Sequence, residues 1–324
     1  MRIYQTLNGM YWKINIALTI IILSSCAQQE TNYSAEFLTS EKSFQTDYLI
    51  EVDAFMSKTK NSSFKLIDFR KKENYEQEHL DGALHIWRND IEDTTYAYEG
   101  MMASKNQIEN LFSDLGINNS DTLVVYDDNG LCDATRLWWL LQNYDFTNVK
   151  LLHGGIEEWK TKGGTVTSEI PVVTKTSFEL NDSTSMKYYI SKEKVKQKVT
   201  DNAIILDTRS SDEFSGKRQK KGASKAGRIP NSINIDWAQA IDYNGDKKFK
   251  SLEELTIIYD GIAKNKEEPI VVYCHSGVRS AHTTFVLTQL LGYTNVKNYD
   301  GSWTEWSHYN DLEFKQDTIT TINN

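Results

Sequence analysis

The sequence predicts an α/β protein built from two copies of one domain, each a parallel sheet with helices on both faces. Short apolar runs alternate with stretches at helical spacing, which is the pattern of a parallel sheet that is covered on both sides. The second half of the chain also repeats motifs of the first half in the same order. With 324 residues, the chain is long enough for two domains of average size.

Alternating strands and helices are expected from about residue 47 onward. The apolar runs 64–69 and 122–126 are short and rich in β-branched or aromatic residues, so we expect buried strands there. The stretch 105–115 is amphipathic and is closed by Gly116, which is typical of the end of a helix. Residues 134–143 have helical spacing and include two tryptophans, and they predict a second helix.

The internal repeat keeps its spacing as well as its order. Asp127 precedes Trp159 by 32 residues, and Cys274 precedes Trp306 by the same number. An equal spacing over this length indicates two copies of one fold rather than two chance matches. The matching motifs are 66–70 with 205–209, 124–127 with 271–274, and 152–159 with 299–306.

The N-terminal segment resembles a targeting signal. Its apolar run, 14–23, has about ten residues, which is too short to span a bilayer but suits a signal peptide. The run ends in Leu23-Ser-Ser-Cys26, which resembles a bacterial lipobox. We therefore expect a lipoprotein of the bacterial cell envelope, lipid-anchored at Cys26 with its soluble domains outside the cytoplasm. An uncleaved anchor over residues 14–23 is the alternative.

These observations together divide the chain into six parts. The ends of the two repeats set the boundaries of the domains, and the polar stretches between them are assigned as tether, linker and tail. The predicted parts are a lipoprotein signal peptide at 1–25, a tether at 26–46, a first domain at 47–163, a linker at 164–187, a second domain at 188–316 and a tail at 317–324.

The second copy carries a cysteine where a thiol becomes reactive. Residues 270–273 predict a buried strand, a helix is expected from Ser280, and Cys274 lies in the turn between them. Free backbone N–H groups and the helix dipole at such a turn lower the pKa of a thiol and hold an anion. Cys274 is therefore the expected catalytic nucleophile. The residues expected to bind the substrate are His275, Ser276, Gly277, Val278, Arg279 and Ser280.

This stretch resembles the active-site loop of the rhodanese family of sulfurtransferases. Residues 298–306 are similar to the C-terminal signature of that family, and 227–235 to its N-terminal signature, with Arg228 where histidine is usual. The resemblance covers nearly all of residues 45–310. It implies that Cys274 takes a sulfane sulfur from a donor, becomes a persulfide and passes the sulfur to an acceptor. The resemblance also implies that neither a metal nor an organic cofactor takes part.

The first copy has Asp127 at the position of the cysteine. A carboxylate cannot accept a sulfane sulfur, so the first copy is predicted to be an inactive rhodanese-like domain, as in tandem members of the family. We expect this domain to form a wall of the active site. Cys132 lies in the same loop, where it is either a buried packing residue or a resolving thiol for Cys274.

The residues favour thiosulfate as the donor, with cyanide or a thiol as the acceptor. Members of the family that use 3-mercaptopyruvate resemble one another in a loop ending Gly-Val-Thr, whereas this loop ends with Arg279 and Ser280. The Arg279 guanidinium can pair with a sulfonate. Glu213 stands where mercaptopyruvate users have an arginine, and is expected to repel a carboxylate. A 3-mercaptopyruvate sulfurtransferase and a non-turnover persulfide carrier for a partner protein are the alternatives.

Other patterns indicate less about function. Phosphatase loops of this fold have five residues between cysteine and arginine, whereas four lie here, which suits a single sulfur atom. The segment 242–253 partly matches a calcium loop, at Asp242, Asn244, Asp246 and Glu253. Lys247 occupies the required glycine position, so we expect a polar turn followed by a helix at Ser251, and no metal. The net charge of −9 argues against nucleic acid as a partner. The basic run 217–221, with Lys225 and Arg228, is either a solvated loop or a region that steers an anionic donor.

Overall fold

The computed structural model describes residues 44–58 and 64–317. The expected signal peptide, Cys26, most of the expected tether and nearly all of the expected tail lie outside the described residues. Within the described part of the chain, no helix is both long and apolar enough to cross a bilayer.

The first domain is built on a five-stranded sheet in which every pairing is parallel. Its central strands are apolar and lose nearly all contact with solvent, as expected for a sheet covered on both faces. In spatial order, the strands are β1 (Leu49–Glu51), β6 (Val149–His153), β5 (Thr122–Tyr126), β2 (Phe64–Asp68) and β4 (Leu84–His85).

The second domain repeats this sheet strand for strand. Its pairings are also all parallel, and each strand has a counterpart at the same place in the first sheet. This agreement confirms the repeat that the spacing of the motifs predicted. In the matching spatial order, the strands are β8 (Tyr189–Ile190), β12 (Val296–Tyr299), β11 (Ile270–Tyr273), β9 (Ile204–Asp207) and β10 (Ile233–Asn234).

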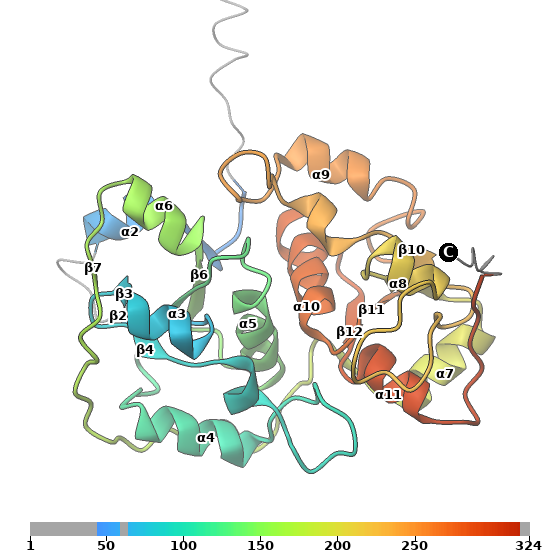
Figure 1. Ribbon diagram of the computed structural model, residues 1–324, viewed down its shortest axis with the longest axis horizontal. Helices are drawn as coiled ribbons and strands as arrows, with labels where there is room; N and C mark the ends of the chain where they lie inside the picture. Colours follow the sequence, from blue (N-terminus) through green and yellow to red (C-terminus); the bar gives the residue numbers. More distant parts are fainter. Residues whose placement is uncertain (1–43, 59–63, 318–324) are drawn as a thin grey trace, which may run out of the picture. The chain divides into compact units, whose positions relative to one another are not determined.

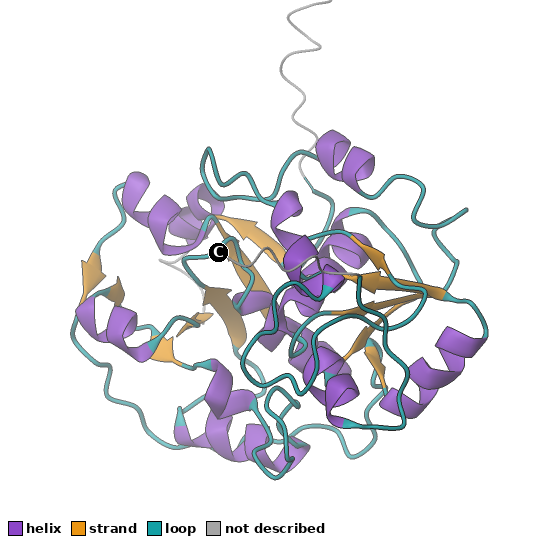
Figure 2. Ribbon diagram, turned by 45° about the vertical axis from the view of Figure 1, so that its right-hand side comes forward, coloured by secondary structure: helices purple, strands orange, loops and turns teal. Residues whose placement is uncertain are grey.

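Helices cover both faces of each sheet (Figures 1 and 2). In the first domain they are α2 (Val52–Lys58), α3 (Lys72–Gln77), the 3-10 helix η1 (Arg88–Ile91), α4 (Lys105–Asp114), α5 (Ala134–Asn143) and α6 (Gly155–Thr161). In the second they are α7 (Lys192–Thr200), α8 (Ser211–Ser215), the 3-10 helix η2 (Trp237–Ala240), α9 (Leu252–Ile258), α10 (Val278–Phe285), its π-helical continuation η3 (Val286–Leu290) and α11 (Ser302–His308). A separate antiparallel pair joins β3 (His79–Leu80) to β7 (Val166–Thr167).

Most of the predicted elements lie where they were expected. Strand β5 and helix α5 have the predicted bounds, and α4 and β2 differ from the prediction by one residue at one end. The helix after Cys274 begins at Val278, two residues earlier than predicted. Its N-cap is Gly277, whose φ of 77° turns the chain sharply enough to start the helix at once.

Aspartate and arginine pairs fix the ends of the corresponding strands in both domains. Arg209 lies 2.6 Å from Asp207, and its guanidinium also donates to the carbonyl oxygen of Gly227. In the first domain, Arg70 lies 2.7 Å from Asp68. All four side chains are buried, so each carboxylate offsets the cost of burying its arginine.

The segment 241–249, expected to be a polar turn, is a hairpin of the second domain that contacts the first domain. Ile241 and Phe249 form an antiparallel bridge across it, and the Asp242 carboxylate accepts hydrogen bonds from the backbone within the turn. The Phe249 N–H donates to His153 Nε2 of the first domain over 3.1 Å. Within the described residues, no three histidine, cysteine or acidic side chains come together as a metal site.

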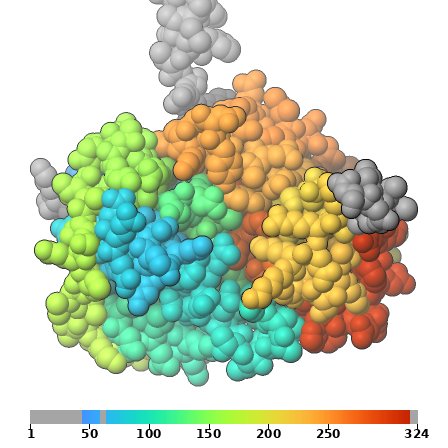
Figure 3. Space-filling view, in the orientation of Figure 1, coloured from blue at the N-terminus to red at the C-terminus, as the bar shows by residue number. Residues whose placement is uncertain are grey.

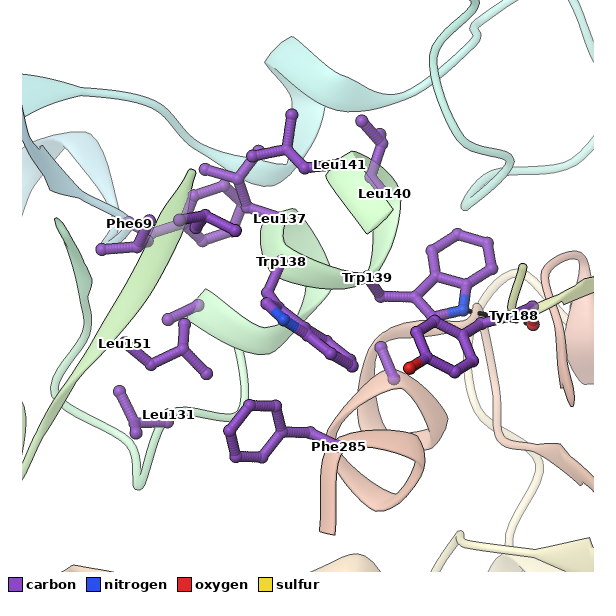
Figure 4. Close-up of a cluster of buried hydrophobic side chains, with 14 of the residues drawn as sticks. Phe69, Leu131, Leu137, Trp138, Trp139, Leu140, Leu141, Leu151, Tyr188 and Phe285 are labelled. Atoms are coloured by element: carbon purple, nitrogen blue, oxygen red, sulfur yellow. Dashed lines mark hydrogen bonds between the residues drawn. The ribbon is translucent and has the colours of Figure 1, made fainter. Parts of the chain in front are cut away.

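The two domains share one hydrophobic core. Helices α5 and α10 pack against each other, and the buried cluster around them takes residues from both domains. The rings of Trp138 and Phe285 meet edge to face with centroids 4.9 Å apart, and Tyr188 lies 5.5 Å from the same tryptophan (Figure 4). The indole of Trp138 therefore stabilises both domains at once.

We expect Trp138→Ala to lower the free energy of unfolding by about 3–5 kcal/mol, because a large buried ring is lost and a cavity remains. Urea unfolding followed by circular dichroism measures this change. The control is Ile257→Ala on α9, where the side chain is exposed and the expected change is below about 0.5 kcal/mol. An equal effect of both variants would contradict a core shared through Trp138.

Candidate active site

Cys274 lies at the carboxyl end of the central strand β11, where the chain turns into α10. The turn requires Gly277. A Cβ atom there would lie 2.7 Å from the Asp300 carbonyl oxygen and 2.8 Å from Arg136 Nη1, and the positive φ disfavours any side chain. The thiol is 1% exposed. Strand and turn together hold it inside the protein at the start of a helix.

Ser302, which the sequence analysis did not single out, fixes the shape of the turn. Its Oγ accepts hydrogen bonds from the N–H groups of Cys274, over 3.1 Å, and of Gly277, over 3.2 Å. It donates in turn to the Tyr299 carbonyl oxygen. The N–H group of Gly277, one of the expected binding residues, is therefore already bound to Ser302. The available signal was the position of Ser302 within the C-terminal signature.

The pKa of the Cys274 thiol is lowered despite its burial. Burial is the largest influence and raises its pKa, but the positive charge of Arg279 and hydrogen bonds from Ser280 and Ser276 lower the pKa overall. Ser280 Oγ lies 3.3 Å from Sγ. The predicted binding residues Ser276, Arg279 and Ser280 thus all act on the sulfur.

Arg279 acts on the thiol through its charge, while its guanidinium is held by a carboxylate. Its Nη1 and Nη2 donate to the two Glu213 oxygens on α8 over 2.7 and 2.9 Å. This bidentate pair corrects two interpretations of the sequence. Arg279 does not present a free fork to a sulfonate, and Glu213 is not an unpaired charge that repels a carboxylate. Burial opposes the ionisation of Glu213, but Arg279 lowers its pKa to about 2.

The side chains of His275 and Val278 are structural parts of the loop. His275 Nε2 lies 2.9 Å from the Lys221 carbonyl oxygen, so the proton is on Nε2. Burial, followed by the charge of Lys220, lowers the pKa of His275 to about 4, which keeps the ring neutral at pH 7. Val278 is buried at the first position of α10.

The corresponding loop of the first domain is filled by its own carboxylate. Asp127 Oδ1 accepts hydrogen bonds from the N–H groups of Asn129 and Leu131 over 2.9 Å each. Oδ2 accepts from Asp133 and Ala134 over 2.9 and 3.0 Å. Four backbone donors that could have held an anion from outside are therefore occupied. This geometry explains why the first copy needs neither a thiol nor a ligand.

Cys132 lies beside this filled loop, with its thiol 2% exposed. Burial and the charge of Asp133 raise its pKa well above the ordinary value, so it remains a protonated, weakly nucleophilic thiol at neutral pH. Packing is therefore the better supported of its two expected roles. Arg88, on η1, donates from Nε to Asp133 over 2.6 Å and interacts electrostatically with both Cys132 and Cys274. The sequence contains no motif that would have identified Arg88.

The first domain forms a wall of the Cys274 site, as predicted. A Cβ atom on Gly100 would lie 2.5 Å from Ser276 Cβ, so the loop after η1 lies directly against the active-site turn. Asp300 in the C-terminal signature accepts from the Met102 N–H over 2.8 Å and pairs with Arg136 over 2.7 Å. Through these contacts the first domain holds the active-site turn in position.

Two single variants of the Arg279 and Glu213 pair are expected to shift the thiol pKa of Cys274 in opposite directions. Arg279→Gln removes the nearby cation and leaves the carboxylate, so the pKa rises. Glu213→Gln leaves the cation uncompensated, so the pKa falls. The pH dependence of Cys274 alkylation by iodoacetamide, with the modified residue assigned by mass spectrometry, measures both.

The double variant Arg279→Gln with Glu213→Gln is the control for stability. A single buried charge left without its partner costs several kcal/mol of stability. The double variant removes both charges and avoids this cost. Its thiol pKa should stay above that of the unmodified protein. A shift of the same sign in both single variants would show that they act through disturbed packing rather than through charge.

Comparisons with known proteins agree with this geometry. The model of the Rhodanese-like domain matches residues 51–162 and 191–309, one match for each copy. A protein of Saccharopolyspora erythraea named "Putative thiosulfate sulfurtransferase" is 36% identical over 243 residues, which cover 72% of this chain and 83% of that protein. The "Sulfur carrier protein TtuD" of Thermus thermophilus is 36% identical over 245 residues, covering 72% of this chain and 84% of its own.

Solved structures resemble the whole two-domain unit. The structure of SseA from Escherichia coli, described as a 3-mercaptopyruvate sulfotransferase, matches with a TM-score of 0.69 and 25% identity, over 80% of this chain and 99% of that one. Tum1 from Saccharomyces cerevisiae matches with a TM-score of 0.74 and 21% identity, over 83% of this chain and 98% of its own. This match supports the fold and carries no information about activity. The family match covers both copies, and the relatives cover most of their own length. The chain therefore belongs to the rhodanese family and carries two rhodanese domains in tandem.

Proposed function

We propose that this protein transfers a sulfane sulfur from thiosulfate to cyanide or to a thiol, through a persulfide on Cys274. The observation that carries the proposal is the surroundings of Sγ. The thiol has a lowered pKa, and it lies 3.3 Å from Ser280 Oγ in a loop with four residues between Cys274 and Arg279. A loop of this length has room for one sulfur atom added to Sγ, as in a persulfide anion. The family membership makes the chain a sulfurtransferase of the rhodanese type.

In the first half-reaction, the thiolate of Cys274 attacks the outer sulfur of thiosulfate. A new S–S bond forms to Sγ, the S–S bond of the donor breaks, and sulfite leaves with the electron pair. The outer sulfur of the resulting persulfide carries the negative charge. The groups of Ser276 and Ser280 that lower the thiol pKa hydrogen-bond to Sγ, the atom to which this outer sulfur is attached.

In the second half-reaction, the acceptor attacks the outer sulfur of the persulfide. With cyanide, a C–S bond forms, the S–S bond breaks, and thiocyanate leaves while the Cys274 thiolate takes back the electron pair. A thiol acceptor leaves as a persulfide in the same way. Because the donor product leaves before the acceptor reacts, ping-pong kinetics are expected.

Three candidate functions differ in the sulfur donor and in whether the sulfur is turned over or carried. Thiosulfate is supported by the relatives of Saccharopolyspora erythraea and Mycobacterium leprae that are named putative thiosulfate sulfurtransferases. A 3-mercaptopyruvate activity is the second candidate, favoured by the Ser280 hydroxyl 3.3 Å from Sγ and by the likeness to SseA. Carriage of persulfide sulfur to a partner protein is the third, favoured by the likeness to TtuD.

We expect Cys274→Ser to abolish sulfur transfer, because a serine hydroxyl cannot form a persulfide. Cyanide-dependent thiocyanate formation with thiosulfate and with 3-mercaptopyruvate measures turnover. Mass spectrometry after thiosulfate alone should show one added sulfur on Cys274. The matched control is Cys132→Ser, the same substitution at the other buried free cysteine of the described chain, which should remain active.

The outcomes separate the three candidates. Faster turnover with 3-mercaptopyruvate than with thiosulfate would replace the proposed donor. A persulfide that forms but is not transferred to cyanide or small thiols would indicate a carrier. A thiosulfate-dependent added sulfur on any residue other than Cys274 would refute the assigned nucleophile.

We also propose that the protein is anchored to a membrane of the bacterial cell envelope by a lipid on Cys26. The support is the lipobox-like Leu23-Ser-Ser-Cys26 after a short apolar run. Cys26→Ser should release the protein into the soluble fraction, and labelling with a fatty-acid analogue should stop. Membrane association that persists without the label would indicate that residues 14–23 act as an uncleaved anchor.

A further inference from the structure

The basic segment of the second domain, residues 217–228, does not act as one uniform patch. The Lys217 ammonium lies 3.5 Å from Asp212, and the Arg228 guanidinium lies 2.7 Å from Asp317. Lys225 donates to the Tyr309 carbonyl oxygen over 2.8 Å. These three cations are held by local partners away from Cys274. The structure thus divides a run of charges that the sequence presents as a single feature.

Lys220 differs from these cations because its part of the segment lies on the active-site loop. The next residue, Lys221, accepts the His275 Nε2–H at its carbonyl oxygen over 2.9 Å. A Cβ atom on Gly222 would lie 3.6 Å from the same ring nitrogen. His275 directly follows Cys274, so the backbone on either side of Gly222 packs against the loop that carries the thiol. Figure 3 shows this part of the chain, in yellow, at the surface of the second domain.

The ammonium of Lys220 interacts electrostatically with the groups around the thiol. Desolvation, followed by the positive charge of Arg279, lowers its pKa, whereas the charges of Glu213 and Cys274 raise it. Arg88 of the first domain is also among the charges that act on it. The residue nevertheless remains exposed. Lys220 is therefore close enough to the site to interact with its charges and open enough to meet a molecule arriving from solvent.

Two other cations that act on the Cys274 thiol are already neutralised. Arg279 is bound by both oxygens of Glu213, and Arg88 is paired with Asp133. Lys220 has no ion pair within the described residues. When the Cys274 thiol ionises it adds a negative charge, so a dianion such as thiosulfate then meets net repulsion unless one cation remains available. Lys220 can supply that charge, and its electrostatic effect is largest at the mouth of a low-dielectric site.

We propose that Lys220 is the residue that docks the anionic sulfur donor beside Cys274 and so favours donors of high negative charge. This inference rests on the proposed function, since it assigns a residue that selects the donor for that reaction. Lys220 acts before the S–S bond is broken and takes no part in the transfer itself. Its removal should therefore weaken the binding of the donor and leave the chemical step intact.

Steady-state kinetics of the purified full-length protein provide the first test. Lys220→Gln should raise the KM for thiosulfate about tenfold and change kcat less than about twofold. Lys220→Arg keeps the charge and should restore most of the affinity. The matched control is Lys217→Gln, which removes a paired lysine of the same segment and should leave both constants unchanged. The KM of the unmodified protein should also rise with salt more steeply than that of Lys220→Gln.

A second test needs no sulfur transfer at all. Iodoacetate carries a negative charge and iodoacetamide does not, and both alkylate the Cys274 thiolate. Lys220→Gln should slow the reaction with iodoacetate several-fold and leave the reaction with iodoacetamide nearly unchanged, with Cys274 identified as the modified residue by mass spectrometry. If thiosulfate proves not to be a substrate, this ratio still tests whether Lys220 attracts anions to the thiol.

The proposal is overturned if Lys220→Gln leaves the ratio of the two alkylation rates unchanged, or if Lys217→Gln lowers it equally. The second result would assign the effect to the net charge of the segment. A kcat that falls with an unchanged KM would also contradict a docking role. Loss of the persulfide signal in the unmodified protein, with a normal shift in the alkylation ratio, would refute the proposed function alone.

Discussion

The lowered pKa of the buried Cys274 thiol is the constraint on which the rest of the site depends. A thiol that is 1% exposed prefers to stay protonated, because a negative charge loses its hydration inside a protein. The Arg279 charge and the hydrogen bonds of Ser276 and Ser280 outweigh this effect and lower the thiol pKa. Each element around the loop can be explained by how it keeps one of these groups in place.

The dependence continues outward from the thiol. Arg279 is itself largely buried, and a buried guanidinium needs a partner, which Glu213 on α8 provides with both oxygens. The loop keeps its turn because Ser302 Oγ holds the N–H groups of Cys274 and Gly277. The first domain presses on the same turn through Gly100, at a contact too close for any side chain. A substitution at any of these positions is therefore expected to change the position or the pKa of the Cys274 thiol.

The two copies solve the same backbone problem in different ways. A turn from a strand into a helix leaves N–H groups without partners, and an anion is the natural way to satisfy them. In the first domain the chain supplies the hydrogen-bond acceptor itself, as the carboxyl group of Asp127. In the second domain Cys274 takes that place, and hydrogen bonds from Ser280 and Ser276 help to lower the pKa of its thiol. The two domains pack together through a core that α5 and α10 share around Trp138.

The sequence by itself determined the fold class and the repeat, and it singled out Cys274 as the expected nucleophile. Apolar periodicity defines the strands and helices, because burial on both faces of a sheet requires it, and the equal spacing of Asp127 and Cys274 to their following tryptophans fixes the correspondence of the copies. Only the tertiary structure decided the partners of the charges. Arg279 and Glu213 are 66 residues apart, and nothing local indicates that they form a bidentate pair rather than two independent recognition groups. The same holds for Arg88 and Lys220, which reach the site from different domains. Electrostatic interactions depend on distance in space, and the order of residues along the chain does not contain that distance.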